Sequence, residues 1–265
     1  MELLQRVRGI PEFWDRIASA QSRLLALDYD GTLAPFKVSR MEARPFPGVI
    51  DALRTIQEDA RTQVAIVSGR PTSELLQLVG AFPFHFIGSH GWEWRGADGS
   101  SVKASVSPAE RAALAEGQKL TQQAGLGNLL ELKIGSLALH SRGLEEAARI
   151  EHRVKGLWQP LIERFSLEVR QFNGGIELRL LEHNKGTALT ELRERSMPDS
   201  LVVYVGDDET DEDAFRAIRG FGLGIRVGET GVSSAASGFL ESGAEVLRFL
   251  QTWSAVADRV QERKP

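Results

Sequence analysis

Leu24-Leu25-Ala26-Leu27-Asp28-Tyr29-Asp30-Gly31-Thr32-Leu33 is the most informative segment of this chain. Its four leading apolar residues predict a strand buried on both faces, as in a parallel sheet covered by helices. Side chains two positions apart in a strand point the same way, so Asp28 and Asp30 project together from its carboxyl end. Open α/β sheets bind their ligands at that end, which makes this segment a candidate site.

Asp28 and Asp30 place two like charges close together. Each raises the pKa of the other unless a cation lies between them, and oxygen ligands favour Mg²⁺. The pair therefore predicts a magnesium site. Gly31-Thr32 permits a sharp turn and offers a hydroxyl and free backbone N–H groups. The alternative is a strand that ends in an ordinary acidic Asp-Gly turn and binds no metal.

Composition narrows the class of protein. A chain of 265 residues can form one large core or two modest domains, and 42% hydrophobic and 26% charged residues are ordinary globular values. A net charge of −4 gives no electrostatic reason to expect a nucleic-acid partner. The absence of cysteine excludes disulfides and thiolate metal sites. No segment has the apolar length of a signal-peptide core or a membrane span, so we expect a soluble, cytoplasmic, monomeric protein without a membrane partner.

The first part of the chain alternates strands and helices. Apolar residues at helical spacing predict one or two amphipathic helices in residues 1–20, with a break at Pro11. Buried strands are predicted at residues 24–27, 64–67 and 84–87, and helices from residue 49 and over 72–79. This alternation predicts parallel strands joined by right-handed crossovers.

The middle of the chain has a different pattern. A hairpin over residues 92–103 turns at Asp98-Gly99, and a helix is predicted at 108–124. Further strands are predicted at 129–134 and 137–141, then a helical stretch at 144–165 that Pro160 interrupts or ends, then a hairpin over 167–181. These elements predict a compact antiparallel α+β unit.

The α/β pattern returns after residue 183. It predicts a helix at 187–196, a strand at 201–205, a helix at 213–219, a last strand at 221–227 and a closing helix at 245–256. The predicted fold class is therefore α/β. A Rossmann-like parallel-sheet core is formed by residues 1–98 and 183–265, and a smaller α+β cap domain, residues 99–182, is inserted into it.

Polar residues follow three predicted core strands. Besides Asp28 and Asp30, the segment Ser68-Gly69-Arg70 offers a hydroxyl and free N–H groups that suit an anion. After the strand predicted at residues 201–205, six of the seven residues of the segment 207–213 are acidic. The carboxyl ends of parallel strands meet at one sheet edge, so the three segments should converge. The alternative for the acidic segment is capping of a helix, whose dipole favours acids in its first turn.

Lys185 follows Asn184, a good N-cap, so it lies where a helix dipole disfavours a cation. A nearby anion such as phosphate would explain this placement. The alternative is an exposed lysine tolerated at small cost.

Taken together, these segments resemble a known family. The segments 28–32 and 68–70, Lys185 and the segment 206–211 match, in order, the four motifs of the haloacid-dehalogenase-like phosphatases. Five further segments resemble the narrower family of trehalose-6-phosphate phosphatases, over almost the whole folded chain. They are Gly88-Ser89-His90-Gly91, Glu131-Leu132-Lys133, His140-Ser141-Arg142, Glu177-Leu178-Arg179 and the segment 206–215.

This resemblance implies the roles of the core residues. Asp28 is expected to be the nucleophile that forms an aspartyl-phosphate, and Asp30 the general acid and base. Lys185 is expected both to take part in catalysis and to bind phosphate. The other expected phosphate ligands are Thr32, Ser68 and Gly69, and the expected Mg²⁺ ligands are Asp28, Asp207, Asp211 and the backbone carbonyl of Asp30.

The resemblance also implies which residues contact the sugar. They are Arg70, His90, Gly91, Glu131, Lys133, Arg142 and Glu177. The alternative for those in the cap is a salt-bridged sheet surface. Two positions depart from the family: Ser141 stands where the family usually has an aromatic residue, and Leu180 where it usually has proline.

The function that the resemblance implies is hydrolysis of trehalose 6-phosphate, with a small sugar phosphate as the partner molecule. Three alternatives remain open at this point. The first is a phosphatase acting on another sugar phosphate, such as a sucrose, glucosylglycerol or mannosylglycerate phosphate. The second is a phosphotransferase or phosphomutase that passes the phosphoryl group to a sugar hydroxyl. The third is a catalytically inactive sugar-phosphate-binding module.

Overall fold

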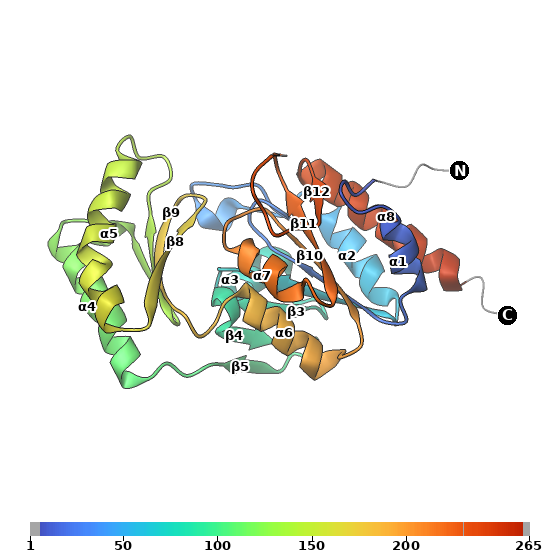
Figure 1. The fold of residues 1–265 in the computed structure, drawn as a ribbon, viewed down its shortest axis with the longest axis horizontal. Helices are drawn as coiled ribbons and strands as arrows, with labels where there is room; N and C mark the ends of the chain where they lie inside the picture. Colours follow the sequence, from blue (N-terminus) through green and yellow to red (C-terminus); the bar gives the residue numbers. More distant parts are fainter. Residues whose placement is uncertain (1–5, 230, 262–265) are drawn as a thin grey trace.

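The computed structural model describes residues 6–229 and 231–261. It has two units, a large sheet flanked by helices and a smaller sheet backed by α4 and α5 (Figure 1). We call the first unit the core and the second the cap. This arrangement confirms the predicted fold class, an α/β core with an inserted α+β unit.

The large sheet has eight strands in the order β12-β11-β10-β1-β2-β3-β4-β5. They are β1 (Arg23–Leu27), β2 (Thr62–Val67), β3 (His85–Gly88), β4 (Glu93–Arg95), β5 (Ser101–Lys103), β10 (Leu201–Gly206), β11 (Gly222–Val227) and β12 (Gly238–Leu240). All neighbours pair in parallel except β3–β4 and β4–β5. The chain runs outward from β1 through β2 and β3, and in the opposite direction from β10 through β11 and β12. The topological switch point therefore lies between β1 and β10.

Helices cover both faces of this sheet. One face packs against α1 (Phe13–Ser19), α2 (Val49–Glu58), α3 (Thr72–Val79) and α8 (Gly243–Gln261), and the other against α6 (Lys185–Ser196) and α7 (Asp211–Ile218). In β1, Leu25 and Leu27 contact the first layer, whereas Leu24 and Ala26 contact the second. Because both faces are covered, the strand is apolar at consecutive positions instead of alternating ones.

The cap contains a four-stranded antiparallel sheet in the order β6-β7-β9-β8. Its elements are α4 (Pro108–Gln123), η3 (Gly127–Leu129), β6 (Leu130–Lys133), β7 (Ser136–His140), α5 (Ala147–Arg164), β8 (Leu167–Phe172) and β9 (Gly175–Leu180). Leu137, Ile176 and Leu178 pack against the two helices. The alternate positions of the same strands carry charged and polar side chains. The cap therefore has an apolar side under its helices and a polar side.

Helix α5 corrects one prediction. It continues to Arg164 through Pro160, which was expected to interrupt or end it. Proline removes one helical hydrogen bond and crowds the carbonyl four residues earlier, here that of Gly156. Trp158 and Leu161 on either side of Pro160 are fully buried in the cap. Their packing holds the helix together across the proline.

Two predictions at the ends of the chain were also incomplete or wrong. The strand ending at Val227 is not the last one, because β12 follows it. This strand has three residues and lacks the length from which alternation is recognised. The predicted N-terminal helical segment contains α1, but residues 6–12 are not helical, and Arg8 pairs with Phe239 of β12. Residues 1–5 lie outside the described part of the chain.

The hairpin of β4 and β5 helps to locate the border between the two units. Both strands belong to the large sheet, and the predicted border at residue 99 falls in their turn. Ser107 begins α4 with a capping box, in which its hydroxyl accepts from Glu110 N. We propose that the inserted unit begins between Lys103 and Ser107.

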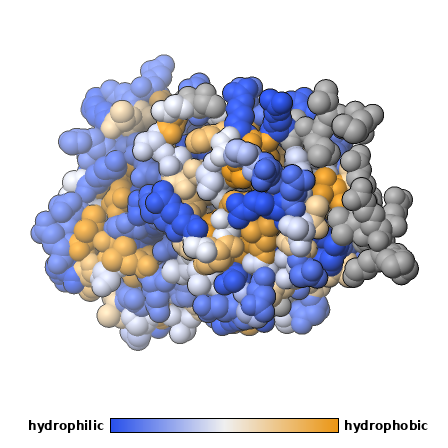
Figure 2. Space-filling model, turned by 45° about the vertical axis from the view of Figure 1, so that its right-hand side comes forward, coloured by the Kyte–Doolittle hydropathy of each residue, from blue (hydrophilic) through white to orange (hydrophobic). Residues whose placement is uncertain are grey.

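The surface mixes polar and apolar side chains. On the face seen in Figure 2, hydrophobic residues lie among hydrophilic ones. Val38 and Val102 are the most exposed of the large hydrophobic residues described, at 76% and 58%. None of the helices in residues 6–229 and 231–261 combines the length and apolar composition that crossing a membrane requires.

A buried ion pair at the start of β1 allows a test of the fold. Arg23 is fully buried and donates to Asp59 at 2.6 Å and to the Ile17 carbonyl at 3.0 Å. Arg23→Met leaves Asp59 without this partner, so we expect the free energy of unfolding to fall by about 3–5 kcal/mol. Urea denaturation measures the loss. The matched variant Arg54→Met removes an exposed arginine and should change stability by less than about 0.5 kcal/mol. Equal losses in both variants would contradict this account.

Candidate active site

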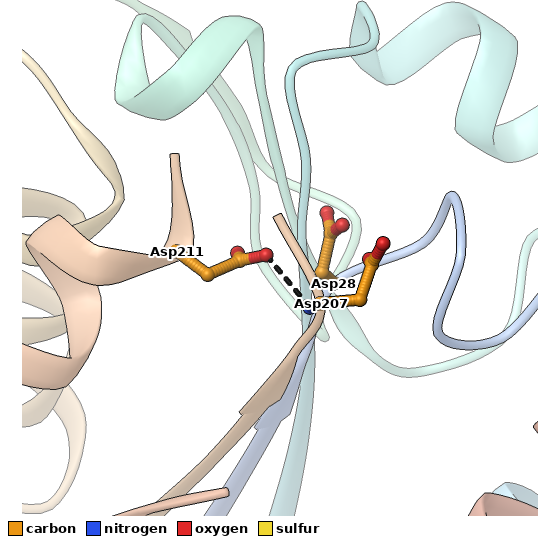
Figure 3. A group of neighbouring side chains, drawn as sticks. All are labelled: Asp28, Asp207 and Asp211. Carbon is orange, nitrogen blue, oxygen red and sulfur yellow. Dashed lines mark hydrogen bonds between the residues drawn. The ribbon is translucent and has the colours of Figure 1, made fainter. Parts of the chain in front are cut away.

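Two aspartates meet at the topological switch point. Asp28 directly follows β1 and Asp207 directly follows β10, and Asp28 N donates to Val205 O at 2.8 Å. Figure 3 shows their side chains next to each other, with Asp211 approaching from the start of α7. One carboxylate oxygen of each of the three residues lies within 4.8 Å of the others. This distance suits a metal ion held between carboxylates.

Gly31 lets Asp207 reach this position. A Cβ atom at residue 31 would lie 2.2 Å from Asp207 Oδ2, and Gly31 has φ +83°, which favours glycine. Thr32 is fully buried, and its hydroxyl donates to Asp207 Oδ1 at 3.3 Å. The Gly-Thr pair after Asp30 thus shapes the loop around the aspartates.

Lys185 lies between two carboxylates. The Asn184 side chain caps α6 by accepting from Gly186 N and Thr187 N, so the helix begins at Lys185 as the sequence predicted. Lys185 Nζ lies 2.8 Å from Asp28 Oδ1 and 2.7 Å from Asp211 Oδ1, and the residue is 2% exposed. The anions beside this lysine in the structure are therefore carboxylates.

Asp211 is held by four donors. Its Oδ1 accepts from Lys185 Nζ and from the Tyr204 hydroxyl, and its Oδ2 accepts from the backbone N–H groups of Asp207 and Asp208. Direct metal coordination by Asp211 would have to displace one of these bonds. In this geometry Asp211 orients Lys185 and the loop that carries Asp207.

The charges at the switch point do not balance. Three carboxylates with one ammonium leave two negative charges in excess. Burial, reinforced by Asp211, raises the pKa of Asp28 to about 8 although Lys185 opposes the shift. Burial and the neighbouring Asp28 also raise the pKa of Asp207. Burial lowers the pKa of Lys185, but Asp211 and Asp28 outweigh it, so that pKa is raised. A divalent cation would neutralise the excess, so these residues fit Mg²⁺.

A strained turn forms the next part of the site. Ser89 and His90 in η2 (Ser89–Gly91) have φ +50° and +58°, unusual values for residues with a side chain. Backbone bonds from Ser89 N to Arg70 O at 2.8 Å and from His90 N to Ser68 O at 3.0 Å hold the turn. The His90 ring lies over Gly69, where a Cβ atom would be 2.6 Å from Nε2. Strain of this kind concentrates at functional sites.

Arg70 binds the side chain of Asp30. Its Nε and Nη2 donate to the two oxygens of Asp30 at 2.6 and 2.7 Å, and its Nη1 donates to Glu74 at 3.0 Å. The sequence assigned Arg70 to the sugar. The structure places its guanidinium on the predicted general acid, with a bidentate geometry that fixes the carboxylate in one orientation.

A cavity of about 250 Å³ lies between the core and the cap. Ten of the predicted site residues line it: Asp28, Asp30, Ser68, Gly69, Arg70, His90, Lys133, Arg142, Glu177 and Lys185. The other predicted residues, Thr32, Gly91, Glu131, Asp207 and Asp211, are not among its described lining residues.

The two predicted sugar contacts outside this lining have other contacts. Gly91 packs against α6, where a Cβ atom would lie 3.3 Å from the Ala188 side chain. Glu131 forms ion pairs with Arg40, with His140 at 2.8 Å and with Lys133 at 3.9 Å. These three partners line the cavity, so Glu131 holds cavity-lining side chains without being among the described lining residues itself.

Glu177 is the centre of the cap's polar side. It is 2% exposed and accepts from Lys133 Nζ at 3.0 Å and Ser136 Oγ at 2.9 Å. His90 Nε2 of the core lies 2.9 Å from its other oxygen. Burial lowers the pKa of His90, and Glu177 remains ionised because Lys133 and His90 outweigh its burial and hold its pKa well below the usual value.

His90 also has an unused acceptor. Its neutral ring donates from Nε2 to Glu177, which leaves Nδ1 unprotonated. Nδ1 is buried and has no hydrogen-bond partner among the described residues. Because His90 lines the cavity, this nitrogen is suited to accept a hydrogen bond from a ligand hydroxyl.

Sequence reasoning did not identify several residues around the cavity. Phe36 and Phe172 line it, and Arg142 lies over the Phe36 ring at 4.6 Å. Arg40 also lines it, and Tyr204 holds Asp211 from below. No periodicity or motif distinguishes these residues from ordinary core or surface positions. The order of the strands is what brings them to the site.

The comparison with known families agrees with this geometry. Residues 26–242 match the model of the trehalose-phosphatase family. The chain belongs to this family. It is 32% identical to probable trehalose-phosphate phosphatase 4 of Oryza sativa subsp. japonica over 86% of its own length, and it spans 64% of that protein. It is 29% identical to trehalose 6-phosphate phosphatase RA3 of Zea mays, covering 97% of the chain and 76% of the maize protein.

Solved structures share the fold. The C-terminal domain of C. albicans trehalose-6-phosphate phosphatase matches 96% of this chain and 99% of its own, with a TM-score of 0.80 and 22% identity. Both units of the present structure therefore fall within a known architecture.

The raised pKa of Asp28 predicts how stability changes with pH without a metal. The folded protein binds a proton at Asp28 that the unfolded chain releases between pH 3.8 and about 8, so folding becomes less favourable as the pH rises through this range. The asparagine side chain in Asp28→Asn cannot ionise, so this variant should not lose stability in this way. We expect its Tm in EDTA to exceed that of the unmodified protein by about 4 °C or more at about pH 8, and by less at about pH 5.

Thermal unfolding followed by circular dichroism measures both proteins across this range. Asp51→Asn, which changes an aspartate that is 84% exposed, serves as the control and should follow the unmodified protein. A constant Tm difference between Asp28→Asn and the unmodified protein at every pH would show that the Asp28 proton does not contribute.

Proposed function

We propose that this protein hydrolyses trehalose 6-phosphate to trehalose and phosphate. The observation that carries the proposal is the cluster of Asp28, Lys185, Asp207 and Asp211 at the switch point. Asp28 and Lys185 of this cluster line a cavity whose other wall is the polar side of the cap. The cluster suits phosphoryl transfer, and the cap supplies hydrogen-bonding groups for a sugar. The family of the chain supports trehalose 6-phosphate as the sugar phosphate.

In the first half of the reaction, a carboxylate oxygen of Asp28 attacks phosphorus. The new oxygen–phosphorus bond forms as the bond from phosphorus to the sugar oxygen breaks, which leaves an aspartyl-phosphate. Lys185, Ser68 and the Gly69 N–H meet the charge on the phosphoryl oxygens. Asp30 gives its proton to the departing sugar oxygen. This requires one Asp30 oxygen to leave Arg70, whose guanidinium occupies both in the structure.

In the second half, Asp30 takes a proton from water and the hydroxide attacks phosphorus. The bond between phosphorus and Asp28 breaks, phosphate is released and the Asp28 carboxylate is regenerated. Lys185 holds Asp28 in place through both halves at 2.8 Å. Asp211 keeps Lys185 oriented and does not itself contact the substrate.

The residues that would hold Mg²⁺ are Asp28, Asp207 and the backbone carbonyl of Asp30, with Asp211 supporting the loop of Asp207. When bound, the ion offsets the repulsion between the Asp28 carboxylate and the phosphate. Gly31 and Thr32 hold the Asp207 side chain at the position from which it would bind the ion.

The cap residues that face the cavity recognise the sugar in this proposal. Glu177, Lys133 and Arg142 offer acceptors and donors for hydroxyl groups, and His90 Nδ1 accepts one more. Phe172 presents an aromatic face beside them. Gly91 and Glu131, which the sequence also assigned to the sugar, are left out of this proposal because they are not among the described residues that line the cavity.

The two departures from the family pattern are not among the described residues that line the cavity. Ser141 is buried and its hydroxyl bonds with Glu151 and the Gly174 carbonyl. Leu180 is 1% exposed and packs in the core of the cap. Neither belongs to the described cavity lining, so neither departure argues against trehalose 6-phosphate. The monomeric state and the cytoplasmic location expected from the sequence remain predictions.

Phosphate release tests this function. The protein should hydrolyse trehalose 6-phosphate in preference to sucrose 6-phosphate, glucosylglycerol phosphate and glucose 6-phosphate, with activity lost in EDTA and restored by Mg²⁺. Asp28→Asn should lower kcat by at least about 10³-fold because it removes the nucleophile. Asp51→Asn should keep full activity. Preference for another sugar would overturn the substrate, and undiminished activity in Asp28→Asn would overturn the mechanism.

A further inference from the structure

A chain of ion pairs leads from Asp30 to the cap. Arg70 holds both oxygens of Asp30 and donates to Glu74 Oε2 at 3.0 Å. Arg40 Nη2 donates to the same Glu74 oxygen at 2.9 Å, and Arg40 Nη1 pairs with Glu131. No motif of the sequence contains Arg40, which lies in the loop between β1 and α2, in η1 (Arg40–Glu42).

Arg40 joins the two units of the molecule. Glu74 belongs to α3 of the core, whereas Glu131 belongs to β6 of the cap. The side chains of Arg40, Glu74 and Glu131 are 28%, 23% and 19% exposed. Charges buried to this extent attract each other more strongly than fully exposed pairs, because less water screens them.

This connection can open without leaving a charge unpaired. If the cap moves away, Arg40 keeps Glu74, and Glu131 keeps His140 and Lys133 within the cap. Burial raises the pKa of Glu131, but His140, Lys133 and Arg40 outweigh it and lower that pKa to about 2, so the carboxylate is ionised when the units are closed. Breaking an ion pair is most costly when one partner is left buried and uncompensated, and here neither is.

Other pairs between the units lie elsewhere, and they include His90 with Glu177 at 2.9 Å and Arg170 with Asp213 at 3.5 Å. Arg179 of β9 pairs with Asp213 of α7 at 2.6 Å, one residue before the chain leaves β9 for the core. Such a pair lies beside the connection and stays near its partner when the units separate. Arg40 and Glu131 come from segments that are far from this connection in the sequence.

The size of the cavity favours separation of the units when a large substrate enters. Its volume of about 250 Å³ is below the roughly 300–1,000 Å³ of usual ligand sites, and both units line it. A disaccharide phosphate enters and leaves such a cavity when the cap moves. Closure then has to be favoured again for each turnover.

We propose that Arg40 is a positioning residue that favours the closed cap by pairing with Glu131. The inference rests on the proposed function. Arg40 does not act on the substrate itself. Its contribution should be large for a substrate whose sugar contacts the cap and small for a phosphate ester that does not fill the cap side.

The test compares two substrates, trehalose 6-phosphate and p-nitrophenyl phosphate. In Arg40→Gln, kcat/KM for the sugar phosphate should fall by at least about tenfold relative to that for the small ester. Arg44→Gln is the matched control, since Arg44 is an exposed arginine of the same loop. Arg40→Lys keeps the charge without the two-pronged geometry and should lie between the unmodified protein and Arg40→Gln.

A double-mutant cycle examines the partner. If Arg40 acts through Glu131, the double variant Arg40→Gln/Glu131→Gln should lose little more kcat/KM for trehalose 6-phosphate than Glu131→Gln alone. Small-angle X-ray scattering without substrate provides a readout that does not depend on activity. Arg40→Gln should have a larger radius of gyration than the unmodified protein and Arg44→Gln.

The outcomes separate the inference from the function on which it rests. Equal losses on both substrates, fully additive variants, or an unchanged radius of gyration would each overturn the role of Arg40. Failure of the unmodified protein to hydrolyse the sugar phosphate would overturn the proposed function. Scattering would then still decide whether Arg40 favours the closed state.

Discussion

The structure depends on an excess of negative charge at one point of the sheet. Asp28, Asp207 and Asp211 lie together at the switch point with the single ammonium of Lys185 among them. Such a group is unstable in a dry interior unless its charge is offset, and the surrounding chain is arranged to tolerate it. Lys185 is the first residue of α6, and the start of this helix places its ammonium beside the carboxylates. The hydroxyl of Tyr204 and two backbone N–H groups hold Asp211. The remaining excess of two negative charges is one that a divalent cation would neutralise.

The acidic segment after β10 shows how one run of like charges is distributed. Asp207 faces the cluster, and Asp208 accepts from Asn173 N of the cap at 2.8 Å. Glu212 accepts from Ser234 and from Ala235 N, which anchors the loop before β12. Asp213 receives Arg179 of the cap at 2.6 Å. Each of these four acids therefore has its own surroundings, and the segment joins the acidic cluster, the loop before β12 and the cap.

The sequence predicted the features that depend on local pattern. The strands buried on both faces, the Asn184 cap and the convergence of strand ends follow from hydrophobic runs and backbone rules, and the structure has all of them. It could not predict features decided by tertiary packing. Pro160 lies within a helix because buried neighbours hold it there. Glu131 alternates with Lys133 on one strand as expected, yet its carboxylate pairs with Arg40, which lies more than 80 residues earlier in the sequence.

The ion pairs of Lys185 at the switch point differ from the pair of Arg40 and Glu131 between the core and the cap. Lys185 is 2% exposed and pairs with both Asp28 and Asp211, so moving it away from the two carboxylates would leave its charge buried without compensation. Arg40 and Glu131 each retain a partner within their own unit, so their pair can break and form again at low cost. A reacting centre needs fixed groups, whereas a cavity closed by a second unit needs a contact that can be broken. The difference between the two kinds of pair is burial, since Lys185 is 2% exposed whereas the side chains of Arg40 and Glu131 are 28% and 19% exposed. In the proposed mechanism, this difference would let the cap move while Asp28 stays in place.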